Sequence, residues 1–225
     1  MESSATLLDR VLLENGDRLS RQEFERRYDA IPELKKAELI EGVVHVAAAL
    51  RYRSHGQPRA HIMAWLGLYA ALTPGVELAD NTTVRFDDRN APQPDALLRL
   101  EKGGRSQVSQ DDYIEGAPEL IVEIAASTAS YDLYEKLDVY YRNQVQEYLV
   151  WRVMDNELDW FRWRDGQYVK SGVSEEDCRQ SQVFPGLWLD VAALLGGDLG
   201  SVVAMVQEGC HSQPHQDFVA QLATQ

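Results

Sequence analysis

Apolar and polar residues alternate with strand-like and helix-like periods along the chain. Residues 119–125 are almost continuously apolar, which is typical of a strand buried on both faces of a sheet. Residues 58–72 carry apolar side chains at helical spacing, and Thr73-Pro74-Gly75 ends that helix. A second amphipathic pattern predicts a helix over residues 131–143.

Shorter segments predict further elements. Ser20 and Glu23 have the spacing of a capping box, which predicts a helix from there to about Tyr28. The β-branched residues around Glu41-Gly42 predict a hairpin over residues 38–46, and residues 103–113 are typical of a polar loop. The remaining predicted strands are 82–86, 95–100, 147–153, 158–163 and 167–170.

This order of elements predicts an α/β domain with a mixed central sheet flanked by helices. We expect a single domain over residues 1–195, with its core at about 38–195. Residues 201–208 have the pattern of another helix, and the sequence from Gly209 onward is polar. Residues 196–225 are therefore predicted to form a C-terminal helical or partly disordered tail.

Composition is that of a folded globular protein, with 44% hydrophobic and 26% charged residues in a chain of 225. No apolar run reaches the roughly 18 residues that a membrane span needs, which predicts no membrane association. Residues 1–10 lack an apolar run behind a basic start, and Cys178 and Cys210 imply no disulfide framework. These features together predict a cytoplasmic protein.

The formal net charge of −14 bears on any nucleic-acid function. Lys and Arg drive binding to phosphates by releasing counterions, so an acidic chain needs a local concentration of positive charge. An equally acceptable interpretation is that the acidity only maintains solubility. The basic residues that could contact phosphate are Arg51, Arg53, Arg59, Arg99, Lys102 and Arg105.

Two acidic residues stand where they could share a metal ion. Asp95 follows Pro94 at the start of a predicted strand, and Glu123 lies inside the most apolar strand of the chain. A carboxylate buried in such a strand is costly unless it is paired. If the two strands are neighbours, Mg²⁺ or Mn²⁺ is the natural partner for both oxygen ligands. Lys136, on the following helix, could orient water or stabilise charge on a phosphate.

A purely structural interpretation explains the same residues. Glu123 could pair with an arginine, and Asp95 could be a turn residue. Asp132 and Lys136 are one helical turn apart and could form an exposed pair worth a few tenths of a kcal/mol. Spacing alone does not decide between the two interpretations.

Several segments resemble, in order and spacing, the Uma-type family of restriction-endonuclease-like proteins. The central block consists of residues 116–124, Ser127-Thr128, Asp132, Glu135-Lys136-Leu137 and Tyr140. The flanking segments that match are residues 38–42, Pro94-Asp95, residues 147–150 and residues 184–187. Each motif is weak alone, and their combined order over residues 38–195 is specific.

The resemblance implies a PD-(D/E)XK nuclease core that binds magnesium or manganese. Asp95 and Glu123 would then be metal ligands, together with the backbone carbonyl of Ile124. Lys136 would be the catalytic lysine, displaced from strand to helix, because Ala125 occupies the usual lysine position. Glu38 would be an accessory acid near the metal. The implied activity is metal-dependent hydrolysis of DNA phosphodiester bonds by an endonuclease.

Two other functions are compatible with the sequence. A catalytically weak or inactive nuclease-fold protein, acting as a binding or regulatory module, would fit the acidity and the absence of the family's usual Ser-Pro turn after Ala126. An oligomeric scaffold, or a homodimer, would use the aromatic side chains of the C-terminal strands, among them Trp151 and Trp160.

Overall fold

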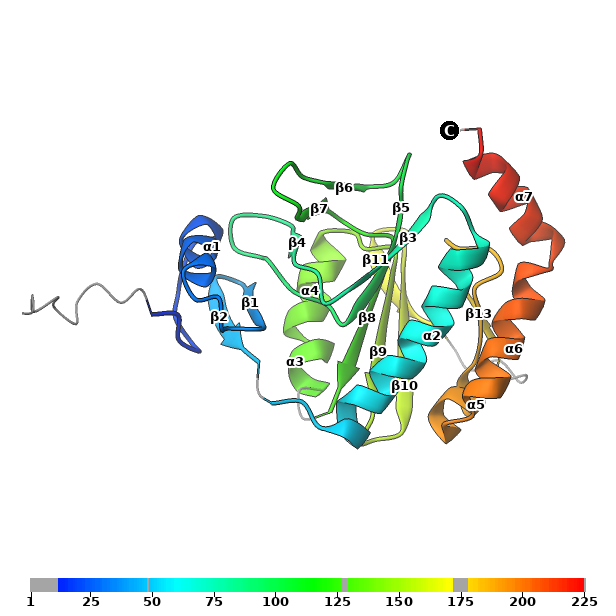
Figure 1. The fold of residues 1–225 in the computed structure, drawn as a ribbon, viewed down its shortest axis with the longest axis horizontal. Helices are drawn as coiled ribbons and strands as arrows, with labels where there is room; N and C mark the ends of the chain where they lie inside the picture. The colour runs from blue at the N-terminus through cyan, green and yellow to red at the C-terminus, as the bar shows by residue number, and fades with distance from the viewer. Residues whose placement is uncertain (1–11, 48, 127–128, 172–177, 225) are drawn as a thin grey trace, which may run out of the picture.

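The computed structural model describes residues 12–47, 49–126, 129–171 and 178–224 (Figure 1). The helices are α1 (Arg21–Asp29), the π-helical turn η2 (Tyr52–Gly56), α2 (Gln57–Leu72), α3 (Ala129–Leu133), α4 (Glu135–Arg142), α5 (Val191–Gly196), α6 (Leu199–Cys210) and α7 (Gln213–Leu222). The strands are β1 (Ala37–Ile40), β2 (Val43–Val46), β3 (Val76–Asp80), β4 (Val84–Arg85), β5 (Ala96–Leu100), β6 (Ser106–Val108), β7 (Ile114–Gly116), β8 (Leu120–Ala125), β9 (Glu147–Arg152), β10 (Glu157–Arg164), β11 (Gln167–Lys170), β12 (Cys178–Gln180) and β13 (Trp188–Asp190).

A six-stranded mixed sheet forms the centre of the molecule, in the order β11-β10-β9-β8-β5-β3. Within this sheet, only β8 and β9 pair in parallel, and the chain connects them through α3 and α4, as a parallel pair requires a crossover. The other neighbouring strands of this sheet are antiparallel. The predicted mixed α/β architecture is therefore confirmed.

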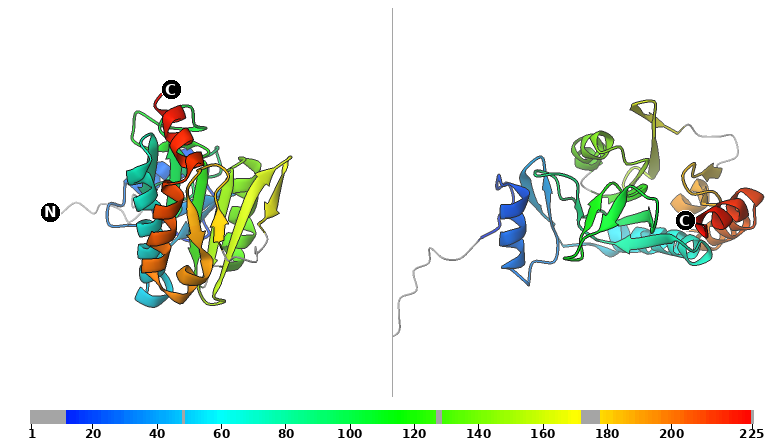
Figure 2. Two further views of the ribbon diagram at one scale, coloured as in Figure 1. Left: turned by 90° about the vertical axis from the view of Figure 1, so that its right-hand side faces the viewer. Right: turned by 90° about the horizontal axis from the view of Figure 1, so that it is seen from above.

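Helices cover both faces of this sheet (Figures 1 and 2). Along β8, Leu120, Val122 and Ile124 belong to the core cluster that includes Trp65 of α2. The intervening Ile121 and Ala125 belong to the opposite cluster, which includes Val139 and Tyr140 of α4. Because side chains alternate along a strand, Glu123 points to the α4 face. The alternation thus decides which helix meets the buried acid.

The N-terminal elements form a small layer at one end of the sheet (Figure 1). The Ser20 side chain accepts from the N–H of Glu23 and caps α1, whereas the Glu23 carboxylate binds Arg26 and Arg27 instead of completing the capping box. The predicted hairpin is confirmed as β1–β2, with Glu41 and Gly42 both at positive φ, as a tight turn of this kind requires.

This hairpin is attached to the central domain through backbone hydrogen bonds. Leu39 and Ala91 exchange both N–H to carbonyl bonds, at 3.2 and 2.8 Å. The contact lies just before β5 in sequence and thereby brings β1 beside the start of that strand. Glu38 reaches the central sheet by this route.

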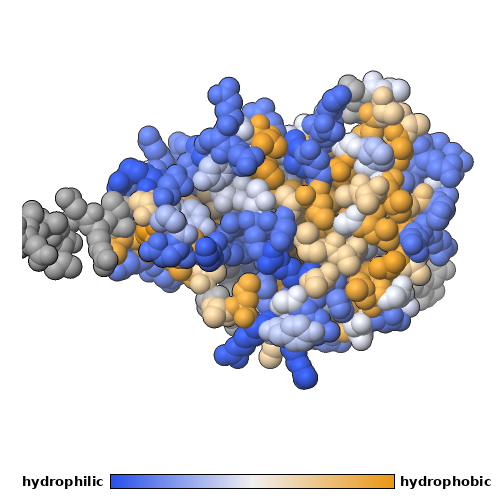
Figure 3. Space-filling view, in the orientation of Figure 1, coloured by the Kyte–Doolittle hydropathy of each residue, from blue (hydrophilic) through white to orange (hydrophobic). Residues whose placement is uncertain are grey.

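The C-terminal helices pack beside α2. Val202 and Val206 of α6 lie in the same core cluster as Trp65, whose Nε1 donates to the carbonyl of Trp188 at 2.8 Å. In α7, His215 lies 2.9 Å from the Thr73 hydroxyl at the end of α2. Apolar side chains gather over this side of the molecule (Figure 3).

Some local features differ from the sequence predictions. Residues 76–80 form the edge strand β3, which was not predicted, and the predicted loop over residues 103–113 contains β6. Both strands are short, and β3 gains its partner β5 only through the fold, a signal that local periodicity lacks. The predicted helix over residues 131–143 is two helices that separate at Tyr134. Ser127 and Thr128, part of the family-like block, lie outside the described residues.

Within the described ranges, no helix combines the length and the apolar character needed to cross a bilayer.

The contact between α6 and the segment before β13 predicts an unusual response to a glycine substitution. A Cβ on Gly209 would lie 2.8 Å from Cγ of Trp188 and closer still to the carbonyl oxygen of Gly186. Gly209→Ala should therefore lower the free energy of unfolding by about 1–3 kcal/mol, although alanine normally stabilises a helix by about 0.5–1 kcal/mol relative to glycine.

Gly196→Ala in α5 is the matched control, because a Cβ there meets nothing within 4 Å. Urea denaturation should show this variant to be at least as stable as the parent protein. Equal stability of both alanine variants would contradict the close approach of α6.

Candidate active site

Two neighbouring strands bring Asp95 and Glu123 together. β5 and β8 pair antiparallel with Ala96 opposite Val122, so continuing the register by one residue places Asp95 opposite Glu123. The two side chains project from the same face of the sheet, because both lie one residue from these paired positions. Both are almost fully buried, at 3% and 2% exposure. The arrangement predicted for the two acids is therefore present.

Asp95 is surrounded by hydrogen-bond donors and positive charge. Its Oδ2 accepts from the N–H of Ile124 at 2.9 Å. Its Oδ1 lies 3.3 Å from Lys36 Nζ and 3.3 Å from His55 Nε2. Burial acts to raise the pKa of Asp95, but His55, Lys36 and the Ile124 N–H together hold it below its ordinary value. Asp95 is consequently the carboxylate of this pair that keeps its charge.

Glu123 has the opposite electrostatic character. Its Oε1 accepts from Lys136 Nζ and from the Tyr140 hydroxyl, each at 2.8 Å. Burial and the nearby charge of Asp95 raise the pKa of Glu123 against the lowering effect of Lys136, and the net pKa is about 8. Asp95 and Glu123 lie too close for both to be ionised without cost. The pKa of Asp95 is lowered and that of Glu123 is raised, so the two groups titrate far apart. A cation shared by the two would remove this penalty.

Lys136 lies at the centre of an acidic cluster. Its Nζ is 2.9 Å from Glu38 Oε1 and 3.7 Å from Asp132 Oδ1, in addition to the Glu123 contact. Burial disfavours the ammonium, but Glu123, Glu38 and Asp132 raise the pKa of Lys136 well above its ordinary value. Its side chain is only 3% exposed. Lys136 therefore remains protonated, and its charge is opposed by three carboxyl groups.

Glu38 joins this cluster from the N-terminal hairpin. Its Oε1 accepts from the backbone N–H of Gln93 at 2.6 Å as well as from Lys136. Gln93 lies two residues before Asp95, so one side chain connects β1, α4 and the approach to β5. The structure thus places Glu38 beside Lys136, and the accessory role expected for Glu38 stays a prediction.

The donor set suits a metal that keeps much of its water. No group of three or more His, Cys, Asp or Glu side chains within the described ranges is arranged to hold a metal ion. Mg²⁺ is usually bound through one or two carboxylates, with water and substrate phosphate completing its shell. The two opposed carboxylates therefore fit Mg²⁺ or Mn²⁺ better than an ion that needs a complete protein cage.

Ile124 fits the position expected for a backbone ligand. Its N–H already points to Asp95, and a strand residue directs its N–H and carbonyl to the same side in an antiparallel pair. The carbonyl of Ile124 is therefore on the side of the strand that faces Asp95. Two carboxylates and this carbonyl form the ligand set that the residues could supply.

Sequence reasoning did not assign three of the residues that complete the site. Lys36 and His55 contact Asp95, and Tyr140 donates to Glu123. His55 is buried in η2, where the N–H of Gly56 reaches the carbonyl of Arg51 five residues back. Local irregularities of this π type are common at functional sites. Nothing in the local sequence around Lys36 indicates its contact, which depends on the docking of the hairpin.

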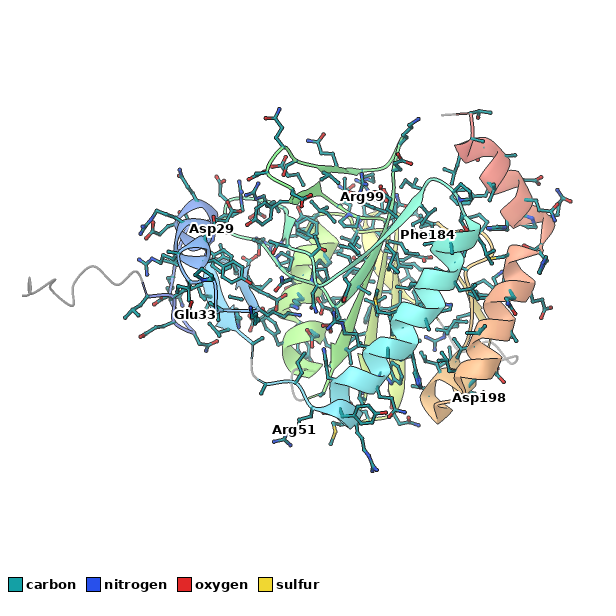
Figure 4. All side chains as sticks on the ribbon, in the orientation of Figure 1. Asp29, Glu33, Arg51, Arg99, Phe184 and Asp198 are labelled. Carbon is teal, nitrogen blue, oxygen red and sulfur yellow. The ribbon has the colours of Figure 1, made fainter. Side chains whose placement is uncertain are left out.

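The basic residues considered for phosphate contact do not form one surface. Arg51 and Arg99 lie at opposite ends of the sheet (Figure 4). Arg99 is buried and pairs with Glu77 and Ser106, and Arg59 pairs with Asp80. A continuous positive surface therefore does not form from the six candidates. Any attraction for phosphate near the site must come from fewer cations.

The aromatic C-terminal strands contribute to the core. Trp160 is fully buried and Trp151 is 5% exposed, and both belong to the cluster around α2. Trp160 and Trp65 meet edge to face, with ring centroids 6.1 Å apart. These two tryptophans stabilise the domain. A homodimer stays a prediction.

The mixed sheet flanked by helices gives the chain a restriction-endonuclease-like fold of the PD-(D/E)XK class. The chain belongs to the Uma2 family, whose description is "Putative restriction endonuclease" and whose model matches residues 21–192. The family resemblance inferred from the sequence motifs is thus confirmed.

A solved structure has the same fold. It is described as a "putative nuclease belonging to DUF820" from Anabaena variabilis ATCC 29413, and it matches with a TM-score of 0.55 at 9% sequence identity. The match covers 80% of this chain and 97% of that one. At this identity the likeness shows the fold alone. Comparison with curated protein sequences found no match.

The cluster predicts a large effect of removing its central cation. Lys136→Met should lower the free energy of unfolding by about 3–5 kcal/mol, because buried carboxyl groups lose their charged partner. Urea denaturation near neutral pH measures this loss. Lys102→Met, at an exposed lysine, is the control and should change stability by less than about 0.5 kcal/mol. A small effect at Lys136 would mean that the cluster is solvated.

The raised pKa of Glu123 predicts a pH dependence of stability. The folded state binds a proton more tightly than the unfolded state, so this contribution is present below about pH 4.5 and is lost as pH rises to about 8. Glu123→Gln cannot lose a proton, so the stability of the parent relative to this variant should fall between pH 5 and pH 8.

Chemical denaturation with a chelator present gives the required stabilities. Glu119→Gln, at a buried acid just before β8, leaves Glu123 in place and should keep the pH dependence of the parent. A difference between parent and Glu123→Gln that does not change with pH would contradict a raised pKa at Glu123.

Proposed function

We propose that this protein is a metal-dependent endonuclease that hydrolyses phosphodiester bonds in DNA. One observation carries the proposal: Asp95, Glu123, Lys136 and Glu38, which lie on four separate segments of the chain, converge in one buried cluster. A buried cluster of charged groups is costly, and well-packed apolar residues of similar volume often give equal or greater stability. Membership in a family described as restriction endonucleases supports DNA as the substrate class.

Asp95 and Glu123, with the carbonyl of Ile124, would hold Mg²⁺ or Mn²⁺. When bound, such an ion supplies an activated water and stabilises negative charge on the phosphate and leaving oxygens. The Ile124 N–H keeps Asp95 oriented, and Lys36 and His55 keep it ionised before the ion arrives. The Tyr140 hydroxyl donates to Oε1 of Glu123, so Oε2 does not take part in this hydrogen bond.

Lys136 would position Glu123 and orient the attacking water beside it. Its ammonium contacts Glu123 and Glu38 at once, so it keeps the two acids at a constant separation. Because Lys136 stays protonated, it would donate a hydrogen bond to water rather than accept a proton from it. A proton released by the attacking water would pass to solvent or to a carboxylate of the cluster.

A binding or regulatory module that retains the fold is the second candidate function. The observation that favours it is the strong pairing of Lys136 with three carboxyl groups, together with a formal net charge of −14. Such a lysine adds no net positive charge to attract phosphate. The two functions differ in whether the metal-loaded protein cleaves DNA.

Cleavage assays distinguish the two functions. We expect the parent protein with Mg²⁺ or Mn²⁺ to cut plasmid or single-stranded DNA, and a chelator to stop cleavage. Asp95→Asn, Glu123→Gln and Lys136→Met should each lower the rate by more than about 100-fold, since the first two weaken a proposed metal ligand and the third removes the cation that positions Glu123 and the attacking water.

Glu119→Gln is the matched control for loss of a buried acid and should retain activity if it folds, which circular dichroism would show. The parent could bind metal, and lose that binding in Asp95→Asn, yet cleave neither plasmid DNA, single-stranded DNA nor RNA. That result would make the binding module the better description.

A further inference from the structure

Two lysines reach the carboxylate pair, and they differ in their surroundings. Lys136 is 3% exposed and has three carboxyl groups around it. Lys36 is 18% exposed, and its ammonium contacts one carboxylate, that of Asp95, and one neutral amide, that of Asn81, at 3.2 Å. Lys36 therefore has solvent access and a smaller opposing charge. It is the better placed of the two to meet an anion that arrives from outside.

The β1 hairpin determines where Lys36 points. Lys36 immediately precedes β1, and the N–H of Ala47 donates to its carbonyl at 3.1 Å, which extends the ladder by one step. Positions two apart on a strand share a face. Lys36 and Glu38 therefore approach the site together, one cation to Asp95 and one anion to Lys136.

Asn81 holds the lysine head at this position. Its backbone has a positive φ of 49°, and its own carbonyl accepts from Gln93 Nε2 at 2.8 Å. Asparagine tolerates this left-handed conformation better than most residues. The turn after β3 thus places an amide oxygen beside Lys36. The Lys36 ammonium therefore contacts two side chains, those of Asn81 and Asp95.

A metal ion at Asp95 would change this arrangement. The Lys36 ammonium contacts Asp95 Oδ1, and the Ile124 N–H donates a hydrogen bond to Oδ2. A divalent cation bound to the same carboxylate would repel a unit positive charge that stays about 3 Å from Oδ1. The long flexible stem of lysine allows the head to move without a change in backbone. The displaced ammonium would then be free beside the substrate phosphate.

We propose that Lys36 is a substrate-contacting residue: it holds Asp95 until a divalent cation binds, and then contacts a non-bridging oxygen of the nucleic-acid phosphate. The inference rests on the proposed function and assigns to Lys36 the phosphate contact that Lys136, enclosed by carboxyl groups, does not provide. It also divides the work of the two lysines. Lys136 positions the acids, and Lys36 meets the substrate.

Binding of Mn²⁺ in the absence of nucleic acid tests the first half of this inference. Calorimetric titration of the full chain should show that Lys36→Met binds Mn²⁺ at least about fivefold more tightly than the parent, because a competing charge is gone. Lys35→Met, at the exposed neighbouring lysine, removes the same charge away from the site and should match the parent. Equal or weaker Mn²⁺ binding by Lys36→Met, or no Mn²⁺ binding by any of the three proteins, would overturn the inference.

Steady-state cleavage of a DNA oligonucleotide tests the second half. Lys36→Met should lower kcat/KM by about 10- to 100-fold, as expected for a lost hydrogen bond to a charged group, and part of this loss should appear in KM. Lys36→Arg should recover part of the loss, whereas Lys35→Met should behave like the parent. Unchanged kcat/KM in Lys36→Met would overturn the phosphate contact.

The failure of the nuclease proposal can be separated from the failure of this one. If the parent binds Mn²⁺ but cleaves nothing, the same oligonucleotide with a fluorescent label becomes a binding probe, since nothing consumes it. Lys36→Met should then bind it about 10- to 100-fold more weakly in Mn²⁺. Equal binding by Lys36→Met and the parent, or no binding by the parent, would overturn the phosphate contact by itself.

Discussion

The site depends on one interaction, the buried contact between Lys136 and Glu123. A carboxyl group in the middle of an apolar strand has no water to solvate it, so its placement requires hydrogen-bond donors or a partner of opposite charge. The helix after β8 supplies that partner at 2.8 Å, and the same ammonium reaches Glu38 from the N-terminal hairpin. One cation therefore connects the sheet, the crossover helix and the hairpin. The position of each of these elements determines the geometry of the others.

Asp95 and Glu123 illustrate how one pair of acids acquires two different properties. Asp95 meets cations and an N–H donor, which keep it ionised, whereas burial raises the pKa of Glu123. Pairs of carboxyl groups with different pKa values are common in active sites that use acid–base chemistry. Without metal, each acid is already paired with a lysine: Asp95 with Lys36, and Glu123 with Lys136.

The small N-terminal layer is part of this pairing, although it stands apart from the central sheet. It contributes one basic residue, Lys36, and one acidic residue, Glu38. Both reach the site because Leu39 pairs with Ala91 just before β5. The acidity of the whole chain therefore says little about local chemistry. What matters for an anionic substrate is which cations remain accessible, and Lys36 is more accessible than Lys136.

The sequence by itself determined the elements whose signal is local and strong. The apolar run of β8, the helical period of α2 and the Glu41-Gly42 turn depend on near neighbours, so they were predicted with nearly the observed bounds. The motifs around Asp95, Glu123, Lys136 and Glu38 likewise selected residues that the structure brings close together. Only the tertiary structure decided the rest. The pairing of β3, the contacts of Lys36 and His55 with Asp95, and the contact of Lys136 with Glu38 all join residues far apart in the chain. Such contacts follow from how strands and helices pack, and periodicity along a single segment carries no information about that packing.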